Sequence, residues 1–205
     1  MGWLQKLLQR TPTPKNPAVK TLYRTDKKLD SKTEEIINRL PQLGDTIRQG
    51  AEYLYHKVLQ EQIGHYDTRF GSNISKQIDD TKQSAILKKL TGFMLVAFFN
   101  QLSELYPDSP VPSGLTDALH YEIYQALPAK GSFVDYLTYR NPNFEDPRLA
   151  PAFKFGNDIA EIMQTLDLSF SFMISQQSPV IMEISQKLIR LVLFDEPIEA
   201  APSAS

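Results

Sequence analysis

The sequence contains no cysteine among its 205 residues. Without a thiol there is no disulfide, no thiolate nucleophile and no zinc site with cysteine ligands, and nothing indicates an oxidising compartment. Glycine is scarce as well, at nine residues, which argues against a turn-rich β-sandwich or β-barrel. Together these absences favour a helical protein.

Long hydrophobic runs are also missing. The longest uncharged apolar run is LTGFMLVAFF, residues 90–99, and ten residues cannot cross a bilayer, so we expect a buried core helix there. Gln5, Lys6, Gln9 and Arg10 interrupt the N-terminal apolar residues, so we do not expect a signal peptide. A cytoplasmic protein is the expectation.

Sequence motifs for catalysis and metal binding are absent too. The chain has no P-loop, GxGxxG, GxSxG, HExxH or ExxH motif, although a Ser-His-Asp set assembled in space stays open. The three histidines are His56, which follows Glu52 by one helical turn, His65 and His120. Their spacings match no common ligand set. We therefore expect no enzyme, cofactor or metal site, and a metal-dependent enzyme using Glu52 and His56 is the weakest alternative.

Charge is present but unevenly spread. Residues 1–32 hold eight basic and two acidic side chains, a net charge of +6, which leaves fourteen basic and twenty-two acidic groups, a net charge of −8, for the remainder. Apolar residues make up 41% and charged residues 22%, as in ordinary globular proteins. A basic arm on an acidic body indicates an anionic partner for the arm, or contact with the chain's own body.

The first ten residues, MGWLQKLLQR, form an amphipathic stub that holds the only tryptophan. On a helical wheel the Trp and three Leu side chains share one face, opposite the cations. Ten residues do not hold a helix in water, so the stub needs a surface, and burying its four apolar side chains offers roughly 6–12 kcal/mol before ordering costs. We expect an anionic membrane surface first, a groove of a partner protein second and intramolecular packing third. The predicted membrane- or partner-binding residues are Trp3, Leu4, Lys6, Leu7, Leu8 and Arg10.

The rest of the chain divides into a linker, a body and a tail. Three prolines in TPTPKNPAVK keep residues 11–20 extended, so residues 1–30 are predicted to be an arm with a Pro-rich linker. Residues 31–195 form the predicted helical domain, and residues 196–205 a disordered tail. Since no segment alternates with a period of two, the predicted fold is all-α, a single-domain bundle of about five to seven helices.

The predicted helices follow from apolar periodicity and capping signals. Ser31 and Glu34 form a capping box for a first helix of roughly 30 residues, in which Pro41 predicts a kink or a break with a new cap at Asp45. Residues 65–73 are predicted to be a loop, and a second helix runs from Ser75 to Tyr106. Its expected buried face is Leu87, Leu90, Met94, Ala97, Phe98, Leu102 and Leu105.

Four further helices are predicted. Two short ones cover residues 115–126 and 132–139, and the last one begins with Ser178 as N-cap and Pro179 as first helical residue. Its inward residues are expected to be Ile184, Leu188, Leu191 and Val192. One continuous helix before it is marked by Ile159, Met163, Leu166, Phe170 and Ile174.

Residues 120–144 form the densest aromatic stretch, with Lys130 and Arg140 among the rings. Tyrosines are common at protein interfaces and at the margins of cores, so an interface or a core margin is the first interpretation of this stretch. A site for a small planar ligand is the second, and a nucleic-acid site is a distant third because the body is acidic. The interface candidates are His120, Tyr121, Tyr124, Tyr136, Tyr139 and Arg140.

Two main hypotheses for function follow. The first is a non-enzymatic helical adaptor or assembly factor, attached through residues 1–10 to the cytoplasmic face of a membrane or to a partner, with another protein bound by the helical body. The alternative is a carrier for a small apolar or planar ligand such as a pigment or lipid. Its cavity would be lined by the Phe-rich second helix, the helix around residues 159–174 and the Tyr-rich stretch.

Overall fold

The computed structural model of the chain describes residues 31–106, 139 and 150–195. The predictions for the N-terminal arm, for the helix at 115–126, for residues 132–138 and for the tail lie outside these residues. Within them the elements are helices and no strand occurs, so the predicted all-α class is confirmed for this part.

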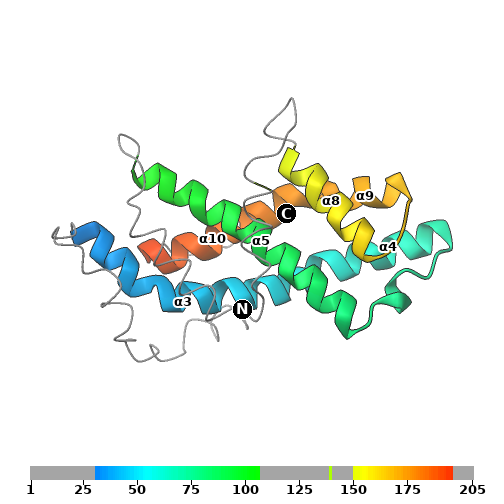
Figure 1. The fold of residues 1–205 in the computed structure, drawn as a ribbon, viewed down its shortest axis with the longest axis horizontal. Coiled ribbons are helices and arrows are strands. Elements are labelled where there is room, and N and C mark those ends of the chain that lie inside the picture. The colour runs from blue at the N-terminus through cyan, green and yellow to red at the C-terminus, as the bar shows by residue number, and fades with distance from the viewer. Residues whose placement is uncertain (1–30, 107–138, 140–149, 196–205) are drawn as a thin grey trace, which may run out of the picture.

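The first helical run is longer than predicted and unbroken. It consists of α3 (Ser31–Leu54), a π-helical turn η1 (Tyr55–Leu59) and α4 (Gln60–Phe70). Pro41 lies inside α3 and the helix continues through it, so the alternative of a break with a new cap at Asp45 is wrong. Figure 1 shows that the N-terminal part of α3 runs at an angle to the rest.

The loop predicted at residues 65–73 begins too early, because residues up to Phe70 belong to α4. The helix ends at Gly71, which has a φ of 65°. This left-handed backbone conformation is sterically unfavourable for most residues but not for glycine, which has no Cβ. Asp67 then organises the connection: its carboxylate accepts hydrogen bonds from the hydroxyls of Ser72 and Ser75 and from the backbone N–H groups of Ile74 and Ser75.

The second predicted helix is α5 (Asp80–Leu105), preceded by a 3₁₀ turn η2 (Ser75–Gln77). It begins later than the predicted Ser75 because Asp79 is its N-cap and accepts from the N–H of Lys82 at 2.8 Å. Residues 90–99 are all buried, which confirms a core helix at this apolar run. Of the predicted face only Leu87 and Leu105 are partly exposed.

By length and composition alone, α5 could cross a membrane. Its most apolar 18-residue window is 72% buried inside the structure. Central helices of proteins that are not in membranes meet the same criterion, so this is weak support for a membrane span.

The C-terminal part holds α8 (Ala150–Ile162), α9 (Leu168–Ser175) and α10 (Ser178–Phe194). The single helix predicted around residues 159–174 is wrong, because the chain turns at Gln164, which has a φ of 58°, and Asp167 caps α9 through the N–H of Ser169. Leu166, expected to be inward, is 100% exposed in this turn.

The predicted start of α10 is also wrong in detail. Gln177 occupies the N-cap position without a side-chain hydrogen bond, and Ser178 is already helical. Leu188 and Val192 are buried as predicted, whereas Ile184 and Leu191 are partly exposed.

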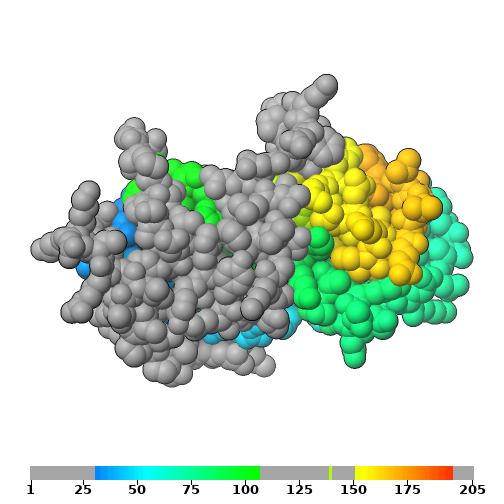
Figure 2. Space-filling model, viewed as in Figure 1, coloured from blue at the N-terminus to red at the C-terminus, as the bar shows by residue number. Residues whose placement is uncertain are grey.

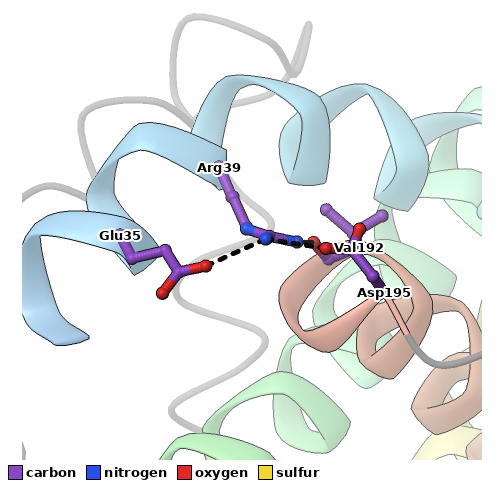
Figure 3. Close-up of polar contacts among 4 residues, drawn as sticks. All are labelled: Glu35, Arg39, Val192 and Asp195. Carbon is purple, nitrogen blue, oxygen red and sulfur yellow. Dashed lines mark hydrogen bonds and ion pairs between the residues drawn. The ribbon is translucent and has the colours of Figure 1, made fainter.

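The helices share one core. Helices α3, α5 and α10 pack against one another, α8 packs on α5, and α9 packs on α8 and contacts α4 (Figure 1). Arg39 links α3 to the end of α10: its guanidinium donates to the Val192 carbonyl at 2.9 Å and to the carboxylates of Glu35 and Asp195 (Figure 3). The hydrogen bond and positive charge of Arg39 hold the pKa of Asp195 below its usual value, and the bond to Val192 satisfies a carbonyl at the end of α10.

Candidate ligand-binding site

A cavity of about 600 Å³ lies among α5, α8, α9, α10 and Tyr139. Its apolar wall comes from Phe93 and Val96 on α5, Phe153 on α8, Phe172 on α9 and Met182 on α10. Since Phe172 is 52% exposed, the cavity reaches the molecular surface. Figure 2 shows α8 and α9 side by side on one face of the molecule.

The close approach of α8 and α9 fixes one side of this cavity. A Cβ added to Gly156 on α8 would stand 2.3 Å from the Ser171 carbonyl oxygen and 2.1 Å from the Ser175 hydroxyl on α9. Only glycine therefore permits this separation of the two backbones. Because Ser175 also lines the cavity, the same contact sets the position of the α9 wall.

Aromatic rings dominate the interior of the site. The rings of Phe93 and Tyr139 meet edge to face at 5.6 Å and 80°, and those of Phe153 and Phe172 lie 6.4 Å apart at 31°. Both separations are in the range that aromatic pairs favour. Phe93 and Tyr139 thus form the buried base of the wall, and Phe153 and Phe172 form its more exposed part.

Tyr139 is held in place by a buried carboxylate. Its ring is fully buried, and its hydroxyl donates to Asp158 on α8 at 2.9 Å. The Asp158 side chain is 8% exposed and pairs with Lys154 at 2.9 Å and Lys89 at 3.3 Å. Two cations and a hydroxyl compensate the buried charge, which fixes the Tyr139 ring in the cavity wall.

Four polar side chains complete the lining: Asn100, Ser175, Gln176 and Ser178. Asn100 and Gln176 are exposed, so their amides stand at the rim. Ser178 is 3% exposed, and its hydroxyl is the buried side-chain oxygen without a hydrogen-bond partner in the described part of the chain. An apolar hollow with a few polar groups is the usual composition of a small-molecule site.

Most residues predicted to bind a membrane or a partner lie outside the described residues. These are all six of the N-terminal stub together with His120, Tyr121, Tyr124, Tyr136 and Arg140. The exception is Tyr139, whose ring lies in the core and not on an exposed surface.

The histidines that the structure describes are engaged in local contacts along one helical run. His56 Nδ1 lies 2.8 Å from the side-chain oxygen of Gln60, and Glu52 contacts Arg48 at 3.4 Å. His65 lies 3.7 Å from Glu61. Over residues 31–106, 139 and 150–195, no group of three or more His, Asp or Glu side chains is placed to hold a metal ion.

Sequence reasoning named three of the segments that line the cavity but missed its polar residues. Phe93, Tyr139 and Phe172 belong to the stretches expected to surround a ligand, and the structure brings them together. Asn100 and Gln176 carry no motif, and Ser178 before a proline indicates a helix cap. The role of Ser178 therefore becomes visible only with its burial and its missing partner.

A second hollow, of about 500 Å³, lies at the turn between α8 and α9, next to Leu166 and Asp167. The Tyr66 hydroxyl donates to Asp167 from α4. Burial, followed by this hydrogen bond, raises the pKa of Tyr66 to about 12, so the phenol stays protonated. This contact joins α4 to α9 and has a structural role.

Comparison of the chain with models of protein families, with curated proteins and with solved structures gives no match in any of the three.

Proposed function

We propose that this protein binds a small apolar or planar molecule in the cavity among α5, α8, α9 and α10, as a carrier without chemistry of its own. The observation that supports the proposal is the cavity itself, with about 600 Å³ and aromatic walls. Small-molecule sites commonly measure 300–1,000 Å³ and are lined mainly by apolar and aromatic side chains.

The packing around the cavity supports the same proposal. The cavity opens to the surface beside Phe172 and has aromatic side chains in its described lining, and apolar surface left in contact with water is unfavourable. Two features fix the positions of its walls: the close contact between α8 and α9 at Gly156, and the hydrogen bond between Tyr139 and Asp158. A preformed site spares a ligand much of the cost of ordering the protein.

The experiment uses N-phenyl-1-naphthylamine, an uncharged dye whose fluorescence rises in apolar surroundings. We expect saturable binding to the full chain, and a loss of affinity of at least about tenfold in Ala152→Phe, because Ala152 lines the cavity and the added ring fills it. The matched control is Ala85→Phe on α5, which makes the same change at another half-buried alanine outside the described cavity lining.

The outcomes separate clearly. Saturable binding that Ala152→Phe weakens and Ala85→Phe leaves intact supports a ligand in the cavity. Absence of saturable binding, or equal binding by both variants, contradicts it. Circular dichroism spectra of both variants are compared with that of the unaltered chain to check that each variant is folded.

A second candidate function is favoured by the sequence of the arm. We propose that residues 1–10 attach the protein to an anionic membrane surface, so that the body acts as an adaptor or assembly factor at the cytoplasmic face. The amphipathic stub and the net charge of +6 over residues 1–32 support this, since each cation near an anionic leaflet adds about 1 kcal/mol. In this proposal the segments at 115–126 and 132–139 complete a bundle of five to seven helices.

Flotation with vesicles of phosphatidylcholine and phosphatidylserine tests the attachment. The full chain is compared with a version lacking residues 1–12 and with a Trp3→Glu, Leu7→Glu variant that keeps its length. We expect the full chain to float and the other two to stay with the soluble fraction. Equal flotation of all three contradicts attachment through the stub and leaves the cavity proposal unaffected.

A further inference from the structure

We infer that the cavity takes an uncharged molecule that carries an aromatic ring and one hydrogen-bonding group, which meets the hydroxyl of Ser178. This inference rests on the proposed function and narrows its ligand class. Three independent observations carry it: the charge of the lining, the kind of apolar side chains in it, and the unsatisfied hydroxyl.

The lining argues against a charged ligand. Among the described residues that form the cavity there is no Asp, Glu, Lys, Arg or His. A charge buried without a partner is strongly unfavourable. The buried carboxylate of Asp158 does not line the cavity, and Lys154, Lys89 and the Tyr139 hydroxyl already compensate it. An anionic or cationic group placed inside would therefore find no opposite charge in this described lining.

The apolar side chains favour a ring over a flexible chain. Four aromatic residues line the site, against Val96 and Met182 as its larger aliphatic side chains. Their rings already pair with one another edge to face or tilted, and the more exposed Phe153 and Phe172 offer a flat ligand further contacts of this kind. Met182 suits such a ligand as well, because methionine side chains are flexible and their sulfur interacts favourably with aromatic rings.

The hydroxyl of Ser178 supplies the polar contact. It is buried and has no hydrogen-bond partner among the described residues, which is rare in folded proteins and unfavourable. Because the oxygen itself is buried, it reaches a ligand in the cavity by rotation about the Cα–Cβ bond, which has three staggered positions. The hydroxyl then acts as donor or acceptor, so a ligand with either group satisfies it. Asn100 and Gln176 at the rim offer amide donors and acceptors to a group that reaches the surface.

The charge claim is tested with two dyes that share one ring system. N-phenyl-1-naphthylamine is neutral, and 1-anilinonaphthalene-8-sulfonate is the same skeleton with a sulfonate. We expect the sulfonate to bind the cavity at least about tenfold more weakly. Only binding that Ala152→Phe weakens is assigned to the cavity. Equal or tighter cavity binding of the sulfonate overturns the inference while the proposed function stands, whereas absence of cavity binding by both dyes removes the proposed function.

The hydrogen-bond claim is tested with Ser178→Ala and two competitors of the neutral dye, 1-naphthalenemethanol and 1-methylnaphthalene. In Ser178→Ala we expect the alcohol to lose affinity by about three- to tenfold, the range of one neutral hydrogen bond, and the hydrocarbon to keep its affinity. The control Ser84→Ala changes an exposed serine of α5 and leaves both unchanged. Equal effects of Ser178→Ala on the two competitors contradict a hydrogen bond to this hydroxyl.

Discussion

Gly156→Ala is the sharpest test of how α8 and α9 shape the cavity. The added Cβ would lie 2.3 Å from a backbone oxygen, Ser171 O, and 2.1 Å from the Ser175 hydroxyl. Real Cβ contacts essentially never fall below 3.0 Å, and a backbone oxygen cannot rotate away as a side chain can. The two helices must therefore move apart by several tenths of an ångström along their contact.

The magnitude follows from two opposing effects. Replacing glycine by alanine inside a helix contributes up to about 1 kcal/mol of stability, whereas overpacking of this kind costs about 1–3 kcal/mol or more. Because the contact involves backbone, we expect the upper part of that range and a net loss of about 2 kcal/mol. Affinity for N-phenyl-1-naphthylamine should fall as well, since Ser175 and its neighbours on α9 line the cavity.

Two other glycines supply matched controls for Gly156→Ala. A Cβ at Gly64 meets no described atom within 4 Å, so Gly64→Ala should stabilise α4 by about 0.5–1 kcal/mol. A Cβ at Gly50 would meet Met94 Cε at 2.7 Å and Leu188 Cδ1 at 3.0 Å, the ends of flexible side chains, so Gly50→Ala should fall between the two.

Urea unfolding followed by circular dichroism measures all three variants. The expected order of midpoints is Gly64→Ala above the unaltered chain, then Gly50→Ala, then Gly156→Ala, with similar slopes. A Gly156→Ala midpoint at or above that of the unaltered chain would refute the close α8–α9 contact.

Three further predictions concern ionisable groups. Asp158→Asn should lower the free energy of unfolding by about 1–3 kcal/mol, because it leaves two partly buried lysines without their carboxylate. The control Glu183→Gln removes an exposed ion pair and should lower it by less than about 1 kcal/mol. Equal urea midpoints of the two variants would contradict this prediction. Burial opposes ionisation of Asp67, but the hydrogen bonds from the following loop outweigh burial and lower the pKa of Asp67 from 3.8 to about 2. The ionised carboxylate therefore contributes fully to the free energy of unfolding above about pH 4, and this contribution is lost as the pH falls towards 2. The stability difference between the unaltered chain and Asp67→Asn should therefore shrink over that interval in urea titrations, and a constant difference would be inconsistent with it. In an absorbance titration of tyrosinate, Tyr66→Phe should remove a step near pH 12, because burial raises the pKa of Tyr66 to about that value. Loss of a step near pH 10 instead would contradict the burial of this phenol.

The helical class and much of the core could be predicted from periodicity. The apolar run at residues 90–99 is buried as expected, because a helix that is apolar on all sides packs in the interior of a helical protein. Leu188 and Val192 face inward for the same reason. The spacing of apolar residues predicts buried positions because burial of apolar surface is the main favourable contribution to helix packing.

The boundaries were predicted less well because they depend on single contacts. The turn at Gln164 and the cap at Asp167 interrupt a stripe that, by spacing alone, predicts one helix. Asp79 and not Ser75 begins α5, since both residue types cap helices and only the folded chain selects between them. Pro41 predicts either a kink or a break, and only the structure decides between them: α3 continues through Pro41, with its N-terminal part at an angle to the rest (Figure 1).

The candidate site illustrates the same limit. Aromatic residues from three expected segments could be assigned to a cavity in advance, but their meeting depends on Gly156 and on the Asp158 contacts, which span unrelated parts of the sequence. An unsatisfied hydroxyl such as that of Ser178 has no sequence pattern at all. Such features arise from packing, not from local propensity.

Methionine methyl groups offer the most direct test of the cavity as a binding site. Met182 lines it, whereas Met94 and Met163 are buried in the core outside its described lining. In a titration of protein labelled with ¹³C at the methionine methyls, the aromatic rings of N-phenyl-1-naphthylamine should shift the Met182 resonance along a saturable curve and leave the Met94 and Met163 resonances in place. A Met182 resonance that stays unmoved at saturating dye, or methyl resonances that all move together, would contradict a ligand site among α5, α8, α9 and α10.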